Sequence, residues 1–385
     1  EQLRMDLSAA VTRKRQVVKR LVGGVAGLLQ RHKVDVYNGT ARLLTPDSIR
    51  VQAGQEAEQE LRAATAILAT GSRPSVPGFI QVDKQFVQTT DQALDETRLP
   101  GRVVIVGGGV IGMEMAGIYS RIGSAVTIVE MLPDILMTED RDIRKTLTRE
   151  LKKAKIDLYL GATLRSVDAQ TQSLEFTDKK GQTQNLSCDR VIVATGRTPV
   201  RTGWEDLEPG PELEGPFIKV DEYQQTSLPG VYAIGDLVGG MMLAHKASTE
   251  AEIAVEHIRG RPKRLTSPHI PRCVWGLLEI GAVGLSEEEA LEAGYTVKTG
   301  NFPLTACGAA QAMDHPQGLV KIVGEKDSGK ILGVHIIGPH ATDLIAEAAT
   351  VMALKGSVED LYAAVKPHPT LSEALMEAAM DWNAW

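Results

Sequence analysis

Apolar and polar positions along this chain form one long mixed segment followed by many short apolar runs. Residues 1–35 combine Lys, Arg, Ala, Leu and Val without a proline, which predicts one long helix. Short apolar runs between polar turns then predict strands, at Asp35–Tyr37, Ile49–Val51 and Ala66–Ala69. Three prolines that follow, Pro74, Pro77 and Pro100, mark a linker-like stretch.

The clearest pattern is a strand, a glycine turn, a helix and a second strand. Its parts are Val103–Val106, Gly107–Gly112, Met113–Ile122 and Ala125–Glu130. Such alternation predicts a parallel sheet. Further strands are expected at Val191–Ala194 and Val231–Ile234, and a helix at Ala247–Ile258.

The C-terminal part of the chain mixes strands and helices after prolines at 262, 268 and 271. Apolar runs predict strands at Val320–Val323 and Ile331–Ile337. Helical patterns cover Ser286–Ala293, Asp343–Leu354 and Leu371–Met380. This mixture predicts an α+β domain.

One internal repeat is visible. Ala66–Pro74 and Val191–Pro199 share an apolar strand that runs into Ala-Thr-Gly, followed by an Arg and a Pro. The two glycines, Gly71 and Gly196, permit close approach of the backbone to a ligand or a neighbouring turn. Two copies indicate a duplicated dinucleotide-binding domain.

The strongest motif is Gly107-Gly-Gly109-Val-Ile-Gly112, which fits GxGxxG between a strand and a helix. Such glycines bring backbone N–H groups to a pyrophosphate at the helix N-terminus. Glu130, at the end of the next strand, would accept hydrogen bonds from the adenosine ribose and repel a 2′-phosphate, which predicts NAD rather than NADP. The alternative is a turn whose glycines only allow close packing. Glu114 would either stabilise the helix dipole or face the nicotinamide.

Two further motifs each leave two interpretations open. Gly235-Asp236 follows an apolar strand, so Asp236 would bind cofactor hydroxyls or form an Asx-type turn or helix cap. His368 and Glu373 lie five residues apart near the C-terminus. They would form a general acid/base pair, or Glu373 would belong to a capping box with Thr370.

Composition and charge remove several classes of function. The net charge of −7 offers no basic excess for nucleic acid. The apolar run Leu21–Leu29 is too short to cross a membrane and lacks the flanks of a signal peptide, so we expect a cytoplasmic protein. The three cysteines, Cys188, Cys273 and Cys307, lie far apart, which excludes a disulfide scaffold or a cysteine-rich metal site.

Together these residues resemble the flavin-dependent pyridine nucleotide-disulfide oxidoreductases over essentially the whole chain. The motifs that carry the resemblance are both Ala-Thr-Gly segments, Gly107–Glu114, Gly230–Asp236, Leu243–Ala247, Val283–Ala290 and His368–Glu373. The most similar branch oxidises protein-bound dihydrolipoamide with NAD. Glu130 argues against the NADP-using glutathione reductases, and the His368/Glu373 pair argues against the mercuric reductases.

The resemblance implies an α/β fold with two Rossmann-like domains, the NAD domain inserted into the FAD domain, and a C-terminal α+β dimerisation domain. The expected segments are 1–98 and 224–266 for FAD, 99–223 for NAD and 267–385 for the interface. Gly71, Gly235, Asp236 and Ala244 would bind FAD. Gly107, Gly109, Gly112, Glu114, Glu130 and Gly196 would bind NAD.

For chemistry, the resemblance implies a homodimer in which His368 and Glu373 serve the redox disulfide of the partner subunit. His368 would take the proton of a dihydrolipoamide thiol. The expected partners are the lipoyl-bearing proteins of 2-oxoacid dehydrogenase or glycine-cleavage complexes. No metal ion is expected.

Two features of the family, its first FAD fingerprint and its Cys-x-x-x-x-Cys pair, do not occur in this sequence. The spacing between Gly107 and Ala194, counted back from Ala69, reaches beyond Glu1, so we expect both features upstream and the FAD domain to be incomplete at its N-terminus. A chain without them would be inactive. The alternatives are a non-catalytic NAD-binding or dimeric interaction module, and another NAD-dependent flavoprotein disulfide reductase.

Overall fold

The computed structural model describes residues 5–54, 58–204, 207–264 and 269–384. The chain divides into two compact units. Unit 1 comprises Glu1–Leu7, Val76–Gly196 and Ser267–Trp385, and unit 2 comprises Ser8–Ser75 and Arg197–Thr266. The predicted four-segment division, with boundaries after residues 98, 223 and 266, stays a prediction.

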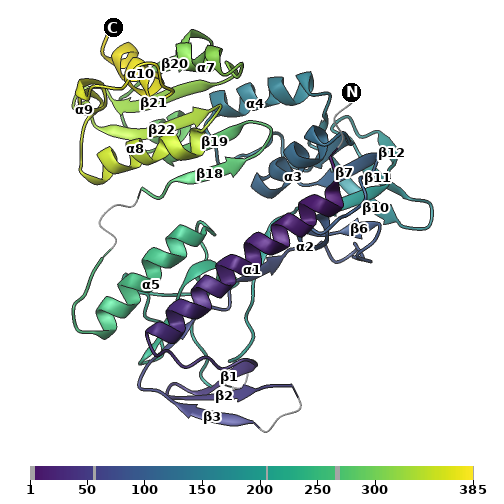
Figure 1. The fold of residues 1–385 in the computed structure, drawn as a ribbon, viewed down its shortest axis with the longest axis vertical. Helices are drawn as coiled ribbons and strands as arrows, with labels where there is room; N and C mark the ends of the chain where they lie inside the picture. Colours follow the sequence, from purple (N-terminus) through teal and green to yellow (C-terminus); the bar gives the residue numbers. More distant parts are fainter. Residues whose placement is uncertain (1–4, 55–57, 205–206, 265–268, 385) are drawn as a thin grey trace. The chain divides into compact units, whose positions relative to one another are not determined.

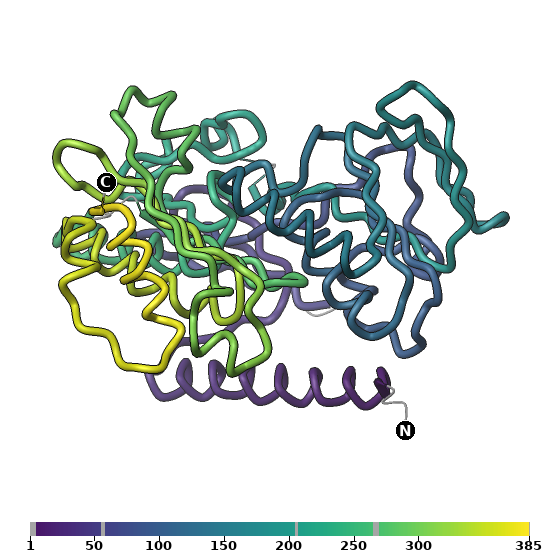
Figure 2. Tube along the Cα trace, turned by 90° about the horizontal axis from the view of Figure 1, so that it is seen from above, coloured from purple at the N-terminus to yellow at the C-terminus, as the bar shows by residue number. Residues whose placement is uncertain are grey.

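The long helix α1 (Leu7–Arg31), which belongs to unit 2 from Ser8 onward, is an uninterrupted coil in Figure 2. The helix predicted over residues 1–35 is therefore confirmed for Leu7–Arg31, and the chain leaves the helix four residues earlier than predicted. An antiparallel sheet follows, formed by β1 (Thr40–Thr45), β2 (Ser48–Gln52) and β3 (Gln59–Arg62). The strand predicted at Asp35–Tyr37 is wrong: these residues are exposed and form no strand, because an apolar alternation needs a face to bury.

The two copies of the repeat continue into paired elements of unit 2. β4 (Ala66–Leu68) pairs in parallel with β17 (Val231–Ala233). β5 (Ser72–Pro74) and β14 (Arg197–Pro199), which directly follow the two Ala-Thr-Gly segments, pair antiparallel. The unit is completed by β15 (Leu213–Glu214), β16 (Phe217–Ile218), the 3-10 turn η1 (Gly235–Val238) and helix α5 (Ala244–Ile258).

The first half of unit 1 contains the parallel sheet that the sequence predicts. Its strand order is β6-β13-β7-β8-β9. The strands are β6 (Val87–Gln88), β7 (Arg102–Val106), β8 (Ala125–Glu130), β9 (Asp157–Leu160) and β13 (Arg190–Val193). The accompanying helices are α2 (Thr90–Ala93), α3 (Val110–Arg121) and α4 (Arg141–Lys153). A separate antiparallel sheet contains β10 (Thr163–Asp168), β11 (Ser173–Thr177) and β12 (Thr183–Ser187).

The second half of unit 1 is a mixed α+β structure, as predicted. Its antiparallel sheet has the order β18-β19-β22-β21-β20. The strands are β18 (Arg272–Trp275), β19 (Glu279–Gly284), β20 (Val297–Pro303), β21 (Leu319–Glu325) and β22 (Ile331–Ile337). The helices are α6 (Glu287–Glu292), α7 (Gly308–Ala312), α8 (Ala341–Ala353), α9 (Val358–Ala363) and α10 (Glu373–Ala384), with the 3-10 turn η2 (Leu304–Ala306).

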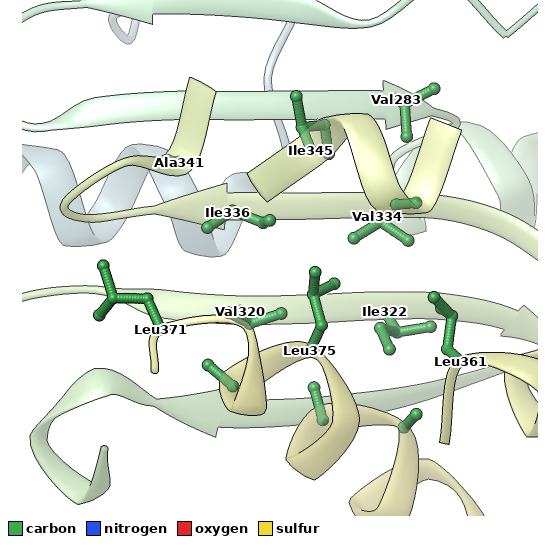
Figure 3. Packing of buried hydrophobic residues seen from close by; sticks show 14 of the residues in the cluster. Val283, Val320, Ile322, Val334, Ile336, Ala341, Ile345, Leu361, Leu371 and Leu375 are labelled. Carbon is green, nitrogen blue, oxygen red and sulfur yellow. The ribbon is translucent and has the colours of Figure 1, made fainter. Parts of the chain in front are cut away.

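Helices cover one face of this antiparallel sheet. Apolar side chains of the helices and of that face form the largest buried hydrophobic cluster in this half of the unit. In Figure 1, α8 lies along the part of the sheet that holds β18, β19 and β22. Figure 3 shows Ile345 of α8 near Val283 and Ile336, and Leu375 of α10 near Val320. Because neighbouring residues of a strand point to opposite faces, the residues between these apolar positions lie on the other face.

Candidate functional site

The glycine turn after β7 packs closely against the neighbouring backbone. Gly107 has a φ of +114°, in the region that favours glycine. A Cβ atom at Gly107 would clash with the carbonyl oxygen of Ala194, and one at Gly112 would clash with that of Gly107. Close packing therefore accounts for glycine at these two positions, and whether they also bind a cofactor stays a prediction.

Gly109 has a different environment and leaves space at the start of α3. It is the N-cap residue of this helix, and a Cβ atom placed on it would meet nothing within 4 Å. Exposed N–H groups at a helix N-terminus attract anions through their partial positive charge. The start of α3 at Gly109 is therefore open, unlike the packed positions of Gly107 and Gly112.

Glu130, the last residue of β8, lies directly against this turn. Its Oε2 accepts a hydrogen bond from the N–H of Gly108, and its Oε1 accepts one from Leu132 at 2.6 Å. Glu130 as a whole is 9% exposed. The structure thus brings Gly107, Gly109, Gly112 and Glu130 together.

Glu114 lies in the second turn of α3 and faces a different neighbour. The helix begins at Val110, so a dipole-stabilising role in the first turn is wrong. Its Oε1 accepts a hydrogen bond from the backbone N–H of Trp275 at 3.1 Å. Burial raises the pKa of the Glu114 carboxyl, although the Trp275 N–H partly offsets this.

Gly196, with a φ of +108°, lies two residues after Ala194, whose carbonyl oxygen packs against Gly107.

In unit 2, the side chain of Asp236 is held by two residues that the sequence analysis did not identify. Ser72 Oγ donates a hydrogen bond to Asp236 Oδ2 and accepts one from Arg197 Nε at 2.6 Å. Arg197 Nε also lies 3.8 Å from Asp236 Oδ2. Asp236 caps neither η1 nor α5, because Ile234 and Leu243 occupy their N-cap positions, so the helix-cap alternative is wrong. A signal existed: Ser72 and Arg197 occupy equivalent positions of the repeat, each directly after its glycine.

The other expected FAD residues lie around the same loop. Gly71 and Gly235 have positive φ angles, of +69° and +75°. The Gly235 N–H donates to Glu250 Oε2 at 2.8 Å, and Glu250 forms an ion pair with Lys246. Ala244 is the first residue of α5 and is exposed. Glu250 is a further residue that the sequence analysis missed.

His368 and Glu373 form a direct pair in the second half of unit 1. His368 Nδ1 lies 2.8 Å from Glu373 Oε1, and 79% of the histidine side chain is exposed. Glu373 Oε2 accepts a hydrogen bond from the Thr370 N–H at 2.8 Å. These two contacts hold the pKa of Glu373 below its ordinary value. Glu373 therefore anchors the turn before α10 and also contacts the imidazole. Only half of the predicted capping box is present, because Thr370 Oγ1 donates to the Pro367 carbonyl and α10 begins at Glu373. The acid/base role of the pair stays a prediction.

Within the described ranges, the cysteines form no disulfide and the acidic and histidine side chains form no metal site. Cys188, Cys273 and Cys307 are free thiols, and burial raises the pKa of Cys188 to about 11. The described residues contain no cluster of three or more His, Cys, Asp or Glu side chains that could hold a metal ion. No helix in the described ranges is long and apolar enough to cross a membrane. A cytoplasmic location stays a prediction.

A cavity of about 710 Å³ in unit 1 lies away from the glycine turn. Its lining includes Gln88, Glu96 and Arg190. Arg190 begins β13, whereas Gly107 follows the end of the parallel neighbour β7, so the cavity lies at the opposite edge of the sheet. It contains none of the predicted site residues.

Comparison with known proteins agrees with this geometry. The family model for pyridine nucleotide-disulphide oxidoreductases matches residues 2–251, and the model for the dimerisation domain of that family matches residues 270–379. Dihydrolipoyl dehydrogenase from Chlorobaculum parvum is 40% identical over 383 residues, which cover 98% of this chain and 81% of the relative. The enzyme of the same name from Bacillus subtilis is 40% identical over 384 residues, covering 96% of this chain and 80% of the relative.

Solved structures show the same fold. LpdA from Mycobacterium tuberculosis has a TM-score of 0.89 at 26% identity, covering 98% of this chain and 84% of its own. The Cu(II) complex of the HOCl-induced flavoprotein disulfide reductase RclA from Escherichia coli has a TM-score of 0.90 at 25% identity, covering 98% and 86%. The predicted arrangement of FAD and NAD domains followed by a dimerisation domain is confirmed. The chain belongs to the pyridine nucleotide-disulphide oxidoreductases.

Proposed function

We propose that this protein is a dihydrolipoyl dehydrogenase, which oxidises protein-bound dihydrolipoamide with NAD through FAD. The observation that carries the proposal is the His368–Glu373 pair, an imidazole oriented by a carboxylate on an exposed turn. The similarity to enzymes of this name along nearly the whole chain supports it. When bound, FAD receives the electron pair from the thiols and NAD accepts it as hydride.

The residues around the glycine turn fit NAD. Gly107 and Gly112 pack where any side chain would clash, while Gly109 leaves the start of α3 open for a pyrophosphate. Glu130 would exchange its backbone partners for the ribose hydroxyls and repel a 2′-phosphate. Glu114 and Gly196 would line the nicotinamide end of the site.

The residues of unit 2 that would hold FAD are Gly71, Gly235, Asp236 and Ala244. Asp236 fits a group with hydroxyl donors, because its Oδ2 is occupied by Ser72 while its Oδ1 has no partner among the described residues. Gly71 leaves open space, since a Cβ atom there would meet nothing within 4 Å.

His368 would take the proton of a dihydrolipoamide thiol. Nδ1 faces Glu373, so the other ring nitrogen, Nε2, would receive the proton. Glu373 stays ionised below the ordinary pKa range of a glutamate because Thr370 and His368 hydrogen-bond to it, and its charge would stabilise the imidazolium that forms.

The proposed assembly is a homodimer, since residues 270–379 match the dimerisation domain of the family. The proposed partners are the lipoyl-bearing proteins of 2-oxoacid dehydrogenase or glycine-cleavage complexes. They would present the dithiol to the exposed turn that carries His368.

The test measures NADH formation from dihydrolipoamide by the full-length gene product reconstituted with FAD. We expect His368→Gln to lower the rate by about 10²–10⁴-fold, the usual effect of losing a general acid/base. His340→Gln is the matched control, because His340 is also exposed and lies 3.5 Å from an acidic partner, Asp343. Normal turnover of H368Q would contradict its role, and a colourless unaltered protein without activity would contradict the function.

A second candidate function is a non-catalytic NAD-binding or dimeric interaction module. The observation that favours it is the absence of a Cys-x-x-x-x-Cys pair from the 385 residues. A flavin absorbance spectrum of this polypeptide separates the two candidates. Retained flavin together with measurable dihydrolipoamide oxidation would exclude the module.

A further inference from the structure

Lys321 of β21 is buried at the boundary between the two halves of unit 1. It is 1% exposed. Its Nζ lies 3.0 Å from Asp140 Oδ1, 2.7 Å from Asp142 Oδ2 and 2.6 Å from Glu287 Oε2. A lysine is almost never fully buried unless it is paired. Three carboxylates around one ammonium group therefore indicate a built charge cluster.

The position of Lys321 on its strand explains why the cluster joins the two halves. Val320 and Ile322 point into the apolar cluster of Figure 3, so Lys321 points to the opposite face of the sheet. His335, its partner across the strand pair, shares that face and is fully buried. Asp140 and Asp142 lie at the start of α4, in the other half of the unit.

Asp140 is fixed from both sides. It is 0% exposed and is the N-cap residue of α4, where its Oδ1 accepts a hydrogen bond from the Asp142 N–H at 2.9 Å. Its Oδ2 accepts a second bond from the Glu287 N–H at 3.2 Å. Asp140 is the last residue of the segment that joins β8 to α4. Lys321 and Glu287, which belong to the half that matches the dimerisation domain, therefore hold the end of this segment.

A second link acts one residue earlier. Arg272 Nε of β18 lies 3.1 Å from Glu139 Oε1, and the side chain of Glu139 is 1% exposed. On the other side, Arg144 of α4 donates to the Glu139 carbonyl at 3.0 Å. Residues 139 and 140 are therefore tied to both halves of the unit.

The segment held in this way reaches the glycine turn. The Leu136 N–H donates to the carbonyl of Gly108 at 3.0 Å, and the Glu139 N–H donates to the carbonyl of Leu136 at 2.8 Å. Leu136 has a φ of +44°, a conformation that a leucine keeps only when its surroundings enforce it. A continuous path runs from Lys321 through Asp140, Glu139 and Leu136 to Gly108.

We propose that Lys321 and Arg272, from the dimerisation half, are positioning residues for the adenosine end of the NAD site. They fix residues 131–140, and this segment fixes Gly108 beside Glu130. The inference rests on the proposed function, since it requires that NAD binds at Gly107–Gly112. It adds that cofactor affinity depends on two cations that do not touch the cofactor.

The test compares the binding of ADP-ribose and of NAD to the full chain by calorimetry, well below the melting temperature. We expect Lys321→Met to weaken both ligands by about 5–30-fold, because both contain the adenosine end. Glu287→Gln is the matched control: it removes one arm of the same cluster on the dimerisation side and should leave both affinities within about twofold. Amide exchange of Leu136 should accelerate in K321M while that of Val334 in β22 does not, whereas a general loss of stability would accelerate both.

Arg272→Gln provides a second variant if K321M does not fold. Arg272 is partly exposed and acts through Glu139, so we expect a folded protein with an affinity for ADP-ribose about 3–10-fold weaker. Folded K321M or R272Q with unaltered affinity would overturn the inference while leaving the proposed function intact. An unaltered chain that binds neither ligand would instead contradict the proposed NAD site, and the inference with it.

Discussion

Glu130 shows how one side chain can combine a structural and a chemical role. One carboxylate oxygen accepts a hydrogen bond from the N–H of Gly108 in the glycine turn, and the other accepts one from the N–H of Leu132, two residues after Glu130. A Cβ atom on Gly108 would lie 3.1 Å from the Glu130 side chain, so the contact is close. The carboxylate therefore shapes the turn and also presents negative charge where the proposed ribose would bind.

This charge gives the first prediction. Exchanging Glu130 for Arg replaces a ribose acceptor with a phosphate partner, so the ratio of the dissociation constants for NADP and NAD should fall by at least about tenfold, which corresponds to ~1.4 kcal/mol. Glu130→Gln, which keeps the shape and removes the charge, should give a smaller change in the same direction. The measurement is a pair of calorimetric titrations, and an unchanged ratio in E130R would contradict the assigned role.

The residues that sequence reasoning missed share a physical cause. Lys321 lies among apolar neighbours in Leu319–Val323, where a lysine suggests a solvent-facing strand position. It is buried because carboxylates from two distant segments surround it, and no local pattern reports such a pairing. Ser72 and Arg197 differ, because their equivalent positions in the repeat were visible in the sequence, but only the pairing of β5 with β14 shows that both reach Asp236.

At the scale of elements, the local sequence pattern predicts helices and strands well where an apolar run lies next to glycines. The predicted strand Ala125–Glu130 matches β8 at both ends, and the helix after the glycine turn was predicted with its start three residues late. The pattern did not reveal that α3 packs closely on the turn between β18 and β19. There, Gly117 faces the backbone of Gly276 and Leu277, and Arg121 donates to the carbonyl of Leu277.

This close approach gives the second prediction. A Cβ atom at Gly117 would lie 2.6 Å from the Leu277 nitrogen, so Gly117→Ala should destabilise the protein by about 1–3 kcal/mol through overpacking. Gly23→Ala in α1 is the control, since a Cβ atom there meets nothing within 4 Å and alanine favours a helix by about 0.5–1 kcal/mol. Urea unfolding followed by circular dichroism measures both. Equal stability of G117A and the unaltered protein would contradict the prediction, because it would mean that the turn at Gly276 and Leu277 shifts to accommodate the methyl group at little cost.

At the scale of the whole molecule, the parts of unit 1 are joined by charges as well as by apolar packing. The cluster around Lys321 includes Asp140 and Asp142 from the start of α4 and Glu287 from α6, with His335 on the neighbouring strand. Burial lowers the pKa of His335, which favours its neutral form. Acid should therefore act on this junction mainly through the carboxylates.

The pKa of Asp142 determines the direction of this effect. Partial burial alone would raise it, but the hydrogen bond and the charge of Lys321 lower it below the ordinary value of 3.8. A carboxylate whose pKa is lower in the folded state stabilises that state above the unfolded pKa, and this contribution is lost as the pH falls through the folded pKa. Asp142 therefore contributes fully at pH 7 and progressively less below about pH 4.

The third prediction follows for Asp142→Asn. Its melting temperature at pH 7 should lie below that of the unaltered protein by roughly 2–4 °C, and the gap should close as the pH falls towards about 3. In a K321M background the same substitution should produce a smaller pH-dependent gap, because only Lys145, whose Nζ lies 3.4 Å from Asp142 Oδ1, would still lower the pKa of Asp142. Scanning calorimetry from pH 7 to pH 3 on the four proteins provides the measurement. A gap that stays constant across this range would mean that Lys321 and Asp142 are not coupled in the folded protein.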